Sequence, residues 1–155
     1  METSDSANRS TPSSTASERT AVIVLDSSFL IAYHNTRDAH HAAAARTMVD
    51  LLGGEWGQAL LLEYVLLEVV TVLRARRGRD VAVAAADRLL QAREVDFVPC
   101  SPLFIETLTT FRHATPAFSF ADAAIATVAR QSEGGFVATF DSDFRDVAGV
   151  TVVPA

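Results

Sequence analysis

Apolar positions in this chain alternate between short branched runs and longer stretches with helical spacing. The run from Val22 to Leu25 ends at Asp26 and is typical of a buried strand. Strands are predicted at about 21–26, 95–98, 136–140 and 150–153. Helices are predicted at about 28–34, 38–52, 62–77 and 80–93, from 101 onward, and from 119 to about 133. Short strands separated by helices predict an α/β/α sandwich, in three layers, with a central, mainly parallel sheet.

Composition divides the chain into a tail and one domain. Residues 1–20 contain ten Ser or Thr residues and no apolar periodicity, so we expect a flexible tail followed by a domain at 21–155. The tail lacks the apolar core of a secretory signal, and no apolar run approaches the ~18 residues of a membrane span. The single Cys100 cannot form an intramolecular disulfide. These features predict a cytoplasmic protein without a membrane segment.

The charge balance limits the classes of function. A formal net charge of -6 argues against broad electrostatic attraction to nucleic acid, although it leaves a local site open. All thirteen basic residues are arginine, so mechanisms that require a catalytic lysine are excluded. Phosphoryl-transferring hydrolases and response-regulator receivers that depend on such a lysine are therefore poor matches.

Acidic residues interrupt or end several of the apolar segments. Asp26 follows the first strand, at the end where ligands bind in open parallel sheets, and Ser27 and Ser28 are candidate caps for the next helix. Glu68 interrupts a mostly apolar helix face, which indicates either a site or a partly exposed residue at the edge of that face.

Two further acidic segments lie in the second half of the chain. Asp122 follows Ser119 by three residues, a spacing that also fits a capping box. Asp141 is predicted to end a strand, as Asp26 does, while Asp143 either shares the site or belongs to a polar turn. Carboxylates gathered at one rim repel one another and favour a bound cation. Oxygen ligands suit Mg²⁺ or Mn²⁺, which promote phosphodiester hydrolysis.

Four segments of the chain contain these acids. They are Leu-Asp-Ser-Ser-Phe-Leu-Ile-Ala with Asp26, Leu-Leu-Glu-Val-Val-Thr-Val-Leu with Glu68, Ser-Phe-Ala-Asp-Ala-Ala-Ile-Ala with Asp122, and Ala-Thr-Phe-Asp-Ser-Asp-Phe with Asp141. Together they resemble the acidic motifs of PIN-domain ribonucleases, and within that family those of the VapC toxins. Their order and spacing match over about residues 21–155.

The resemblance implies an endoribonuclease that depends on Mg²⁺ or Mn²⁺ and uses Asp26, Glu68, Asp122 and Asp141 as metal-site acids. Asp143 is a further candidate ligand, and Thr139 and Ser27 are candidate supporting residues. The resemblance also implies an RNA substrate, a homodimer and an antitoxin protein as partner. An RNA-processing nuclease without an antitoxin, and a non-catalytic RNA- or protein-binding module, remain alternatives.

The basic and histidine residues have structural as well as functional interpretations. Arg74, Arg76 and Arg77 near the end of the Glu68 helix either offset the helix dipole or contact RNA phosphates. The four histidines lack the spacing of a metal site on one helix, and we expect surface or packing roles for them.

Overall fold

The computed structural model describes residues 20–155, and the predicted tail falls almost entirely outside the described residues. The strands are β1 (Ala21–Leu25), β2 (Gln58–Leu62), β3 (Val95–Val98), β4 (Glu133–Ala138) and β5 (Thr151–Val153). The α-helices are α1 (Ser27–His34), α2 (His41–Leu52), α3 (Glu63–Arg77), α4 (Arg79–Gln91), α5 (Phe104–His113) and α6 (Phe120–Gln131). Two short 3₁₀ helices are η1 (Ser101–Leu103) and η2 (Ser142–Phe144).

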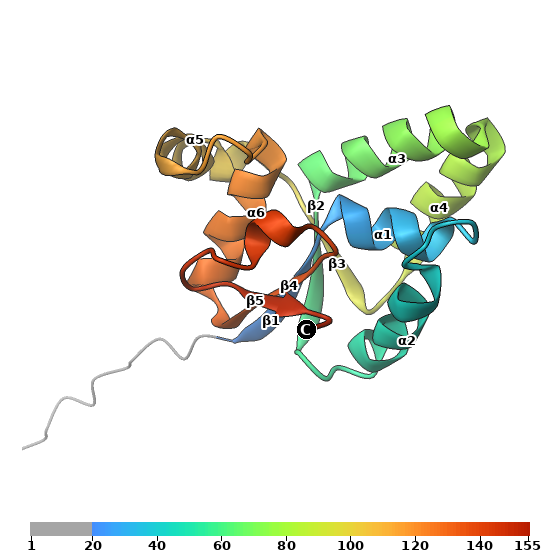
Figure 1. Cartoon of the computed structure of the whole chain (residues 1–155), viewed down its shortest axis with the longest axis horizontal. Helices are drawn as coiled ribbons and strands as arrows, with labels where there is room; N and C mark the ends of the chain where they lie inside the picture. The colour runs from blue at the N-terminus through green and yellow to red at the C-terminus, as the bar shows by residue number, and fades with distance from the viewer. Residues whose placement is uncertain (1–19) are drawn as a thin grey trace, which may run out of the picture.

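The five strands form one parallel sheet in the order β3-β2-β1-β4-β5. Helices α1 to α4 lie in the connections from β1 to β2 and from β2 to β3, and they lie together beside the sheet in Figure 1. Helices α5 and α6 belong to the crossover from β3 back to β4 and lie on the other side. The predicted three-layer α/β/α sandwich is therefore confirmed.

The strand order reverses between β1 and β4, and that reversal determines where a ligand site is expected. Chain connections leave β1 and β4 toward opposite faces of the sheet, so a crevice opens between the carboxyl ends of these two strands. In the register of the sheet, Leu25 pairs with Ala138. Residues that follow these two positions therefore emerge side by side.

The core explains why the short apolar runs became strands and why the helices pack closely on them. Ile23, Val24 and Leu25 of β1 have no exposed surface, as expected for a central strand covered on both faces. Burying each such side chain contributes roughly 1.5–3 kcal/mol. In α6, small residues such as Ala123 and Ala126 are fully buried and let that helix approach the sheet.

The predicted elements are largely present, but one strand was missed. The sequence pattern predicts no strand at residues 58–62 and places Leu62 in the following helix. The structure has β2 there, paired with both β1 and β3. Consecutive leucines fit a helix or a buried strand equally well, and only pairing with distant segments decides between them. The strand predicted at 136–140 also lies earlier, at Glu133–Ala138.

None of the helices within residues 20–155 combines the length and hydropathy that a membrane span needs.

Candidate active site

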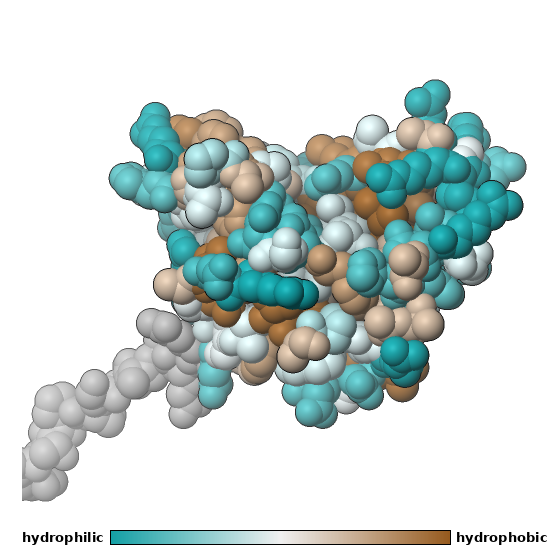
Figure 2. Space-filling view, viewed as in Figure 1, coloured by the Kyte–Doolittle hydropathy of each residue, from teal (hydrophilic) through white to brown (hydrophobic). Residues whose placement is uncertain are grey.

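The four predicted metal-site acids come from four different segments and line one open cavity of about 460 Å³. Asp26 follows β1, Glu68 lies on α3, Asp122 lies in the first turn of α6, and Asp141 follows β4. The cavity lies at the crevice between β1 and β4. Figure 2 shows the molecule hollowed between the side that carries α3 and the side that carries α5 and α6.

Asp26 is the most buried of the four, with 3% of its surface exposed. It is the N-cap residue of α1, but its side chain makes no capping bond. Instead its Oδ2 atom accepts hydrogen bonds from the Ser28 hydroxyl at 2.6 Å and the Thr139 hydroxyl at 2.7 Å. The two hydrogen bonds hold the carboxylate in one orientation.

The same hydroxyl groups tie the ends of β1 and β4 together. Ser28 Oγ accepts from the backbone N–H of Phe140 at 2.9 Å, and Thr139 Oγ1 accepts from that of Asp141 at 2.9 Å. Thr139 therefore contacts two of the predicted acids. Ser28 was expected to cap a helix, and its bonds across the sheet were not predicted. Ser27, the other predicted supporting residue, is nearly buried and lines the cavity.

Asp141 lies three residues beyond the end of β4 and not at the strand end as predicted. It is half-buried and caps η2, because its Oδ1 atom accepts the backbone N–H of Asp143 at 2.9 Å. The Asp143 side chain is exposed and does not line the cavity. The structure thus brings Asp141 to the other acids and leaves Asp143 outside the group.

Asp122 combines a capping role with a place in the cavity. Ser119 Oγ accepts the backbone N–H of Asp122 at 3.1 Å, and Asp122 Oδ2 accepts the backbone N–H of Ser119 at 2.8 Å, which completes the capping box. Burial raises the pKa of Asp122 to about 6, and the charges of Asp26 and Asp141 also raise it, whereas the bonds with Ser119 lower it. The carboxylates of the cavity therefore repel one another.

Glu68 reaches the cavity because α3 presents two neighbouring stripes. Val65, Val69 and Leu73 form the buried stripe, whereas Glu68, Val72 and Arg76 line the cavity at the same four-residue spacing. The exposed Glu68 side chain therefore occupies the edge of the apolar face. Its position fits both interpretations made from the sequence, an edge residue and a site residue.

The carboxylates of the cavity are candidate ligands for a divalent cation. Within residues 20–155, no three carboxylate, imidazole or thiol groups approach closely enough to hold one ion directly. Mg²⁺, however, keeps several waters and is commonly held by only one or two carboxylates. The cavity offers oxygen ligands alone, and their mutual repulsion favours positive charge between Asp26, Asp122 and Asp141. These residues fit a hydrated Mg²⁺ or Mn²⁺ ion.

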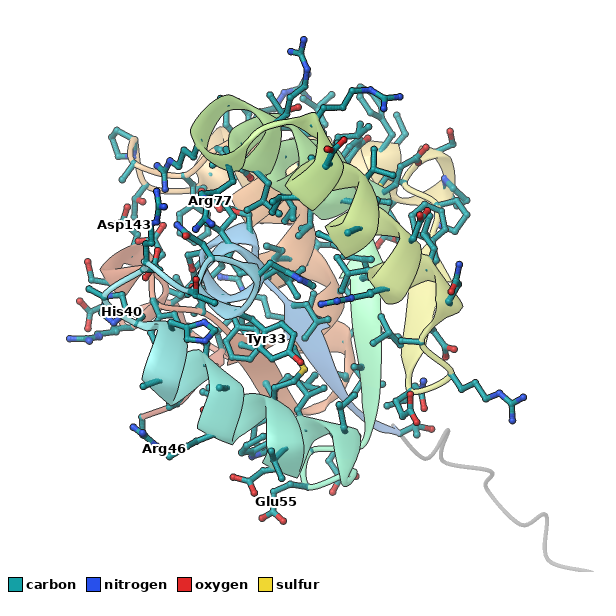
Figure 3. The ribbon with its side chains drawn as sticks, turned by 90° about the vertical axis from the view of Figure 1, so that its right-hand side faces the viewer. Tyr33, His40, Arg46, Glu55, Arg77 and Asp143 are labelled. Carbon is teal, nitrogen blue, oxygen red and sulfur yellow. The ribbon has the colours of Figure 1, made fainter. Side chains whose placement is uncertain are left out.

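The three predicted phosphate-contacting arginines have different environments. Arg76 lines the cavity, and Arg74 is exposed outside its lining. Arg77, labelled in Figure 3, donates from Nη1 to Oδ1 of the buried Asn35 at 2.6 Å and thereby joins α3 to the end of α1. The geometry thus favours Arg76 as the phosphate contact and a structural role for Arg77.

His40, Phe140 and Asp38 also line the cavity, although none was singled out as a site residue. The His40 ring is stacked on Phe140 with centroids 4.5 Å apart and planes 9° apart. Phe140 directly precedes a predicted acid, and that adjacency was the available signal. No local pattern marked His40, because its neighbour in the fold is distant in sequence.

Comparisons with known proteins support the fold and the family. A family model described as PIN domain matches residues 23–150. Among solved structures, VapC20 of Mycobacterium tuberculosis, described as a sarcin-ricin loop cleaving toxin, is 30% identical with a TM-score of 0.67. The match covers 79% of this chain and 92% of VapC20.

Two more distant structures support the fold alone. VapBC2 of Rickettsia felis, solved with a promoter DNA fragment, is 12% identical with a TM-score of 0.58, covering 84% of this chain and 96% of that one. PAE2754 of Pyrobaculum aerophilum is 22% identical with a TM-score of 0.55, covering 86% and 90%. No curated protein matches the chain.

Proposed function

Because this chain belongs to the PIN domain family, we propose that it is a metal-dependent endoribonuclease and the toxin of a toxin–antitoxin pair. The cavity that gathers Asp26, Glu68, Asp122 and Asp141 from four segments carries the proposal. The likeness to VapC20, whose description names a sarcin-ricin loop cleaving toxin, supports the proposed activity.

The proposed reaction is hydrolysis of an RNA phosphodiester bond. One P–O bond forms with the oxygen of water, one P–O bond to a ribose oxygen breaks, and the ribose oxygen takes up a proton. Bound Mg²⁺ or Mn²⁺ supplies positive charge to polarise the phosphate and lower the pKa of water.

Residues of the chain have separate tasks in this scheme. Asp26, Asp122 and Asp141 would hold the cation, and Thr139 and Ser28 fix the Asp26 carboxylate. Glu68, exposed at the edge of the cavity, would bind water near the cation or accept a proton from the attacking water. Arg76, on the same face of α3, binds a phosphate of the RNA.

Cleavage of a structured RNA pool tests the proposal. Purified protein with Mg²⁺ or Mn²⁺ should cut the pool, and EDTA should abolish cutting. Asp26→Asn and Glu68→Gln should each lower the rate at least about 100-fold, since each removes a charge needed in the transition state. Asp87→Asn, an exposed aspartate on α4, is the matched control and should cut normally. Cutting that survives both site substitutions would refute the nuclease assignment.

The biological role is tested separately from the chemistry. For a toxin, expression of the chain should arrest growth, Asp26→Asn should relieve the arrest, and the product of a short neighbouring gene should bind the protein and suppress cleavage. Cleavage without growth arrest and without such a partner would favour an RNA-processing nuclease.

We also propose a homodimer, which light scattering of the purified protein would detect.

A further inference from the structure

Three aromatic rings form a ladder from the core to the edge of the cavity. Phe29 of α1 is fully buried and is stacked on Phe140 with centroids 6.0 Å apart. Phe140 is half-buried and is stacked on His40, which is exposed. The ring planes of His40 and Phe140 are nearly parallel, so stacking on Phe140 anchors the exposed His40 ring to the core. An anchored ring at a surface loses little freedom when another flat group stacks on it.

The backbone around His40 is braced on both sides. The backbone N–H of His40 donates to Oδ1 of Asp38 at 2.8 Å, and the His40 carbonyl accepts from the backbone N–H of Ala44 at 2.9 Å. In addition, Nδ1 of His41 lies 2.8 Å from the carbonyl oxygen of Ala32 and ties α2 to α1. Figure 3 shows His40 at the start of α2, at the edge of the molecule where Asp143 also lies. His40 is thus held in place before any ligand binds.

The His40–Phe140 pair forms a wall between two cavities. On one side is the cavity with the four acids, and on the other is a smaller cavity of about 220 Å³. Both are lined by His40, Phe140 and Asp141, and the smaller one is also lined by Arg145. The exposed Arg145 therefore lines the smaller cavity on one side of this wall, and Arg76 lines the cavity with the acids on the other side.

We propose that His40 is a base-stacking platform that positions the RNA beside the acids. The base of a nucleotide beside the reacting phosphate stacks on His40, while Arg145 binds the next phosphate in the smaller cavity. This inference rests on the proposed nuclease function and adds a substrate-positioning residue to it. Paired bases are already stacked within a helix, whereas unpaired bases are free to stack on aromatic side chains.

Binding by an inactive protein tests the platform without cleavage. The parent is Asp26→Asn in Mg²⁺, and the probes are a labelled oligoadenylate and its duplex with oligouridylate, followed by fluorescence anisotropy. The parent should bind the single strand more tightly than the duplex. Adding His40→Ala should weaken single-strand binding about tenfold, and adding His40→Phe should restore it to within about twofold, because Phe keeps the ring.

Two further variants define the site. His113→Ala, an exposed histidine on α5 that lines a different cavity, is the matched control and should leave binding unchanged. Arg145→Ala should weaken binding and reduce the slope of log affinity against log salt by about one.

The outcomes separate this inference from the proposed function. If the wild type cuts RNA but His40→Ala binds like the parent, or His40→Phe binds no better than His40→Ala, the platform is refuted while the nuclease stands. A parent that prefers the duplex, or binds no single strand, also refutes the platform. If the wild type neither cuts nor binds RNA, both proposals fail.

Discussion

At the scale of single residues, the orientation of the Asp26 carboxylate is set by two hydroxyl groups that are far apart along the chain. Ser28 lies two residues away, but Thr139 is separated from Asp26 by 113 positions in the chain. Thr139 also accepts the backbone N–H of Asp141, so one hydroxyl group sets the relative position of two acids. The loss of that hydroxyl group should therefore affect activity more than a single hydrogen bond would suggest.

Replacing Thr139 by Val tests this role. Val keeps the shape of Thr but cannot donate to Asp26 or accept from Asp141, so we expect the cleavage rate at saturating RNA to fall about 10- to 100-fold. The free energy of unfolding should fall by about 1–3 kcal/mol, because buried polar groups lose their partners. Thr139→Ser keeps the hydroxyl group and should retain most of the activity. Normal cleavage by Thr139→Val would contradict the positioning role.

The sequence predicts which acids belong to the site, but it does not predict the contacts that distant segments make around them. Asp26 is predicted because it follows an apolar strand, and Thr139 is predicted only through the resemblance to the PIN family; the structure places both at the crevice. The cross-sheet bonds of Ser28 and the stacking of His40 depend on the pairing of β1 with β4 and on the path of the loop before α2. Neither arrangement has a signature in local spacing.

At the scale of elements, β2 shows how tertiary pairing decides an ambiguous segment. Its leucines suit a helix as well as a strand, yet β2 is held between β1 and β3. Gly57, with φ of +82°, directly precedes it, and a Cβ atom there would collide with the carbonyl oxygen of Ala21. The glycine thus permits the close approach of the chain to β1, and the sheet register follows from it.

Replacing Gly57 by Ala should destabilise the sheet. We expect the free energy of unfolding to fall by more than about 2 kcal/mol, because strain at positive φ adds to a backbone collision. Gly54→Ala is the matched control, since Gly54 has φ of +84° but nothing within 4 Å of a Cβ atom, and it should lose only about 1–2 kcal/mol. Equal losses in urea unfolding would show that the approach to Ala21 is unimportant.

At the scale of the whole molecule, the acidic cavity lowers stability in exchange for a binding site. Burial and the charges of Asp26 and Asp141 raise the pKa of Asp122, which means that its ionised form is unfavourable in the folded protein near neutral pH. A cation that binds only the folded protein should offset this cost.

Removing one charge should therefore stabilise the metal-free protein. In EDTA near neutral pH, Asp122→Asn should raise the Tm by up to about 2–4 °C, the equivalent of about 1 kcal/mol after allowance for partial exposure. Mg²⁺ should raise the Tm of the wild type and should do so less for the variant. Asp87→Asn should follow the wild type in both buffers, and a variant less stable than the wild type in EDTA would contradict the repulsion.

The parallel sheet has a consequence for synthesis of the protein on the ribosome. Thr139 reaches Asp26 only when β4 has paired with β1, and its own backbone N–H donates to Val153 of β5 at 2.9 Å. A nascent chain that has passed Asp26, Glu68 and even Asp122 therefore still lacks the segment that unites these acids. We therefore expect the proposed nuclease activity to begin only after nearly the whole domain has been translated and has emerged.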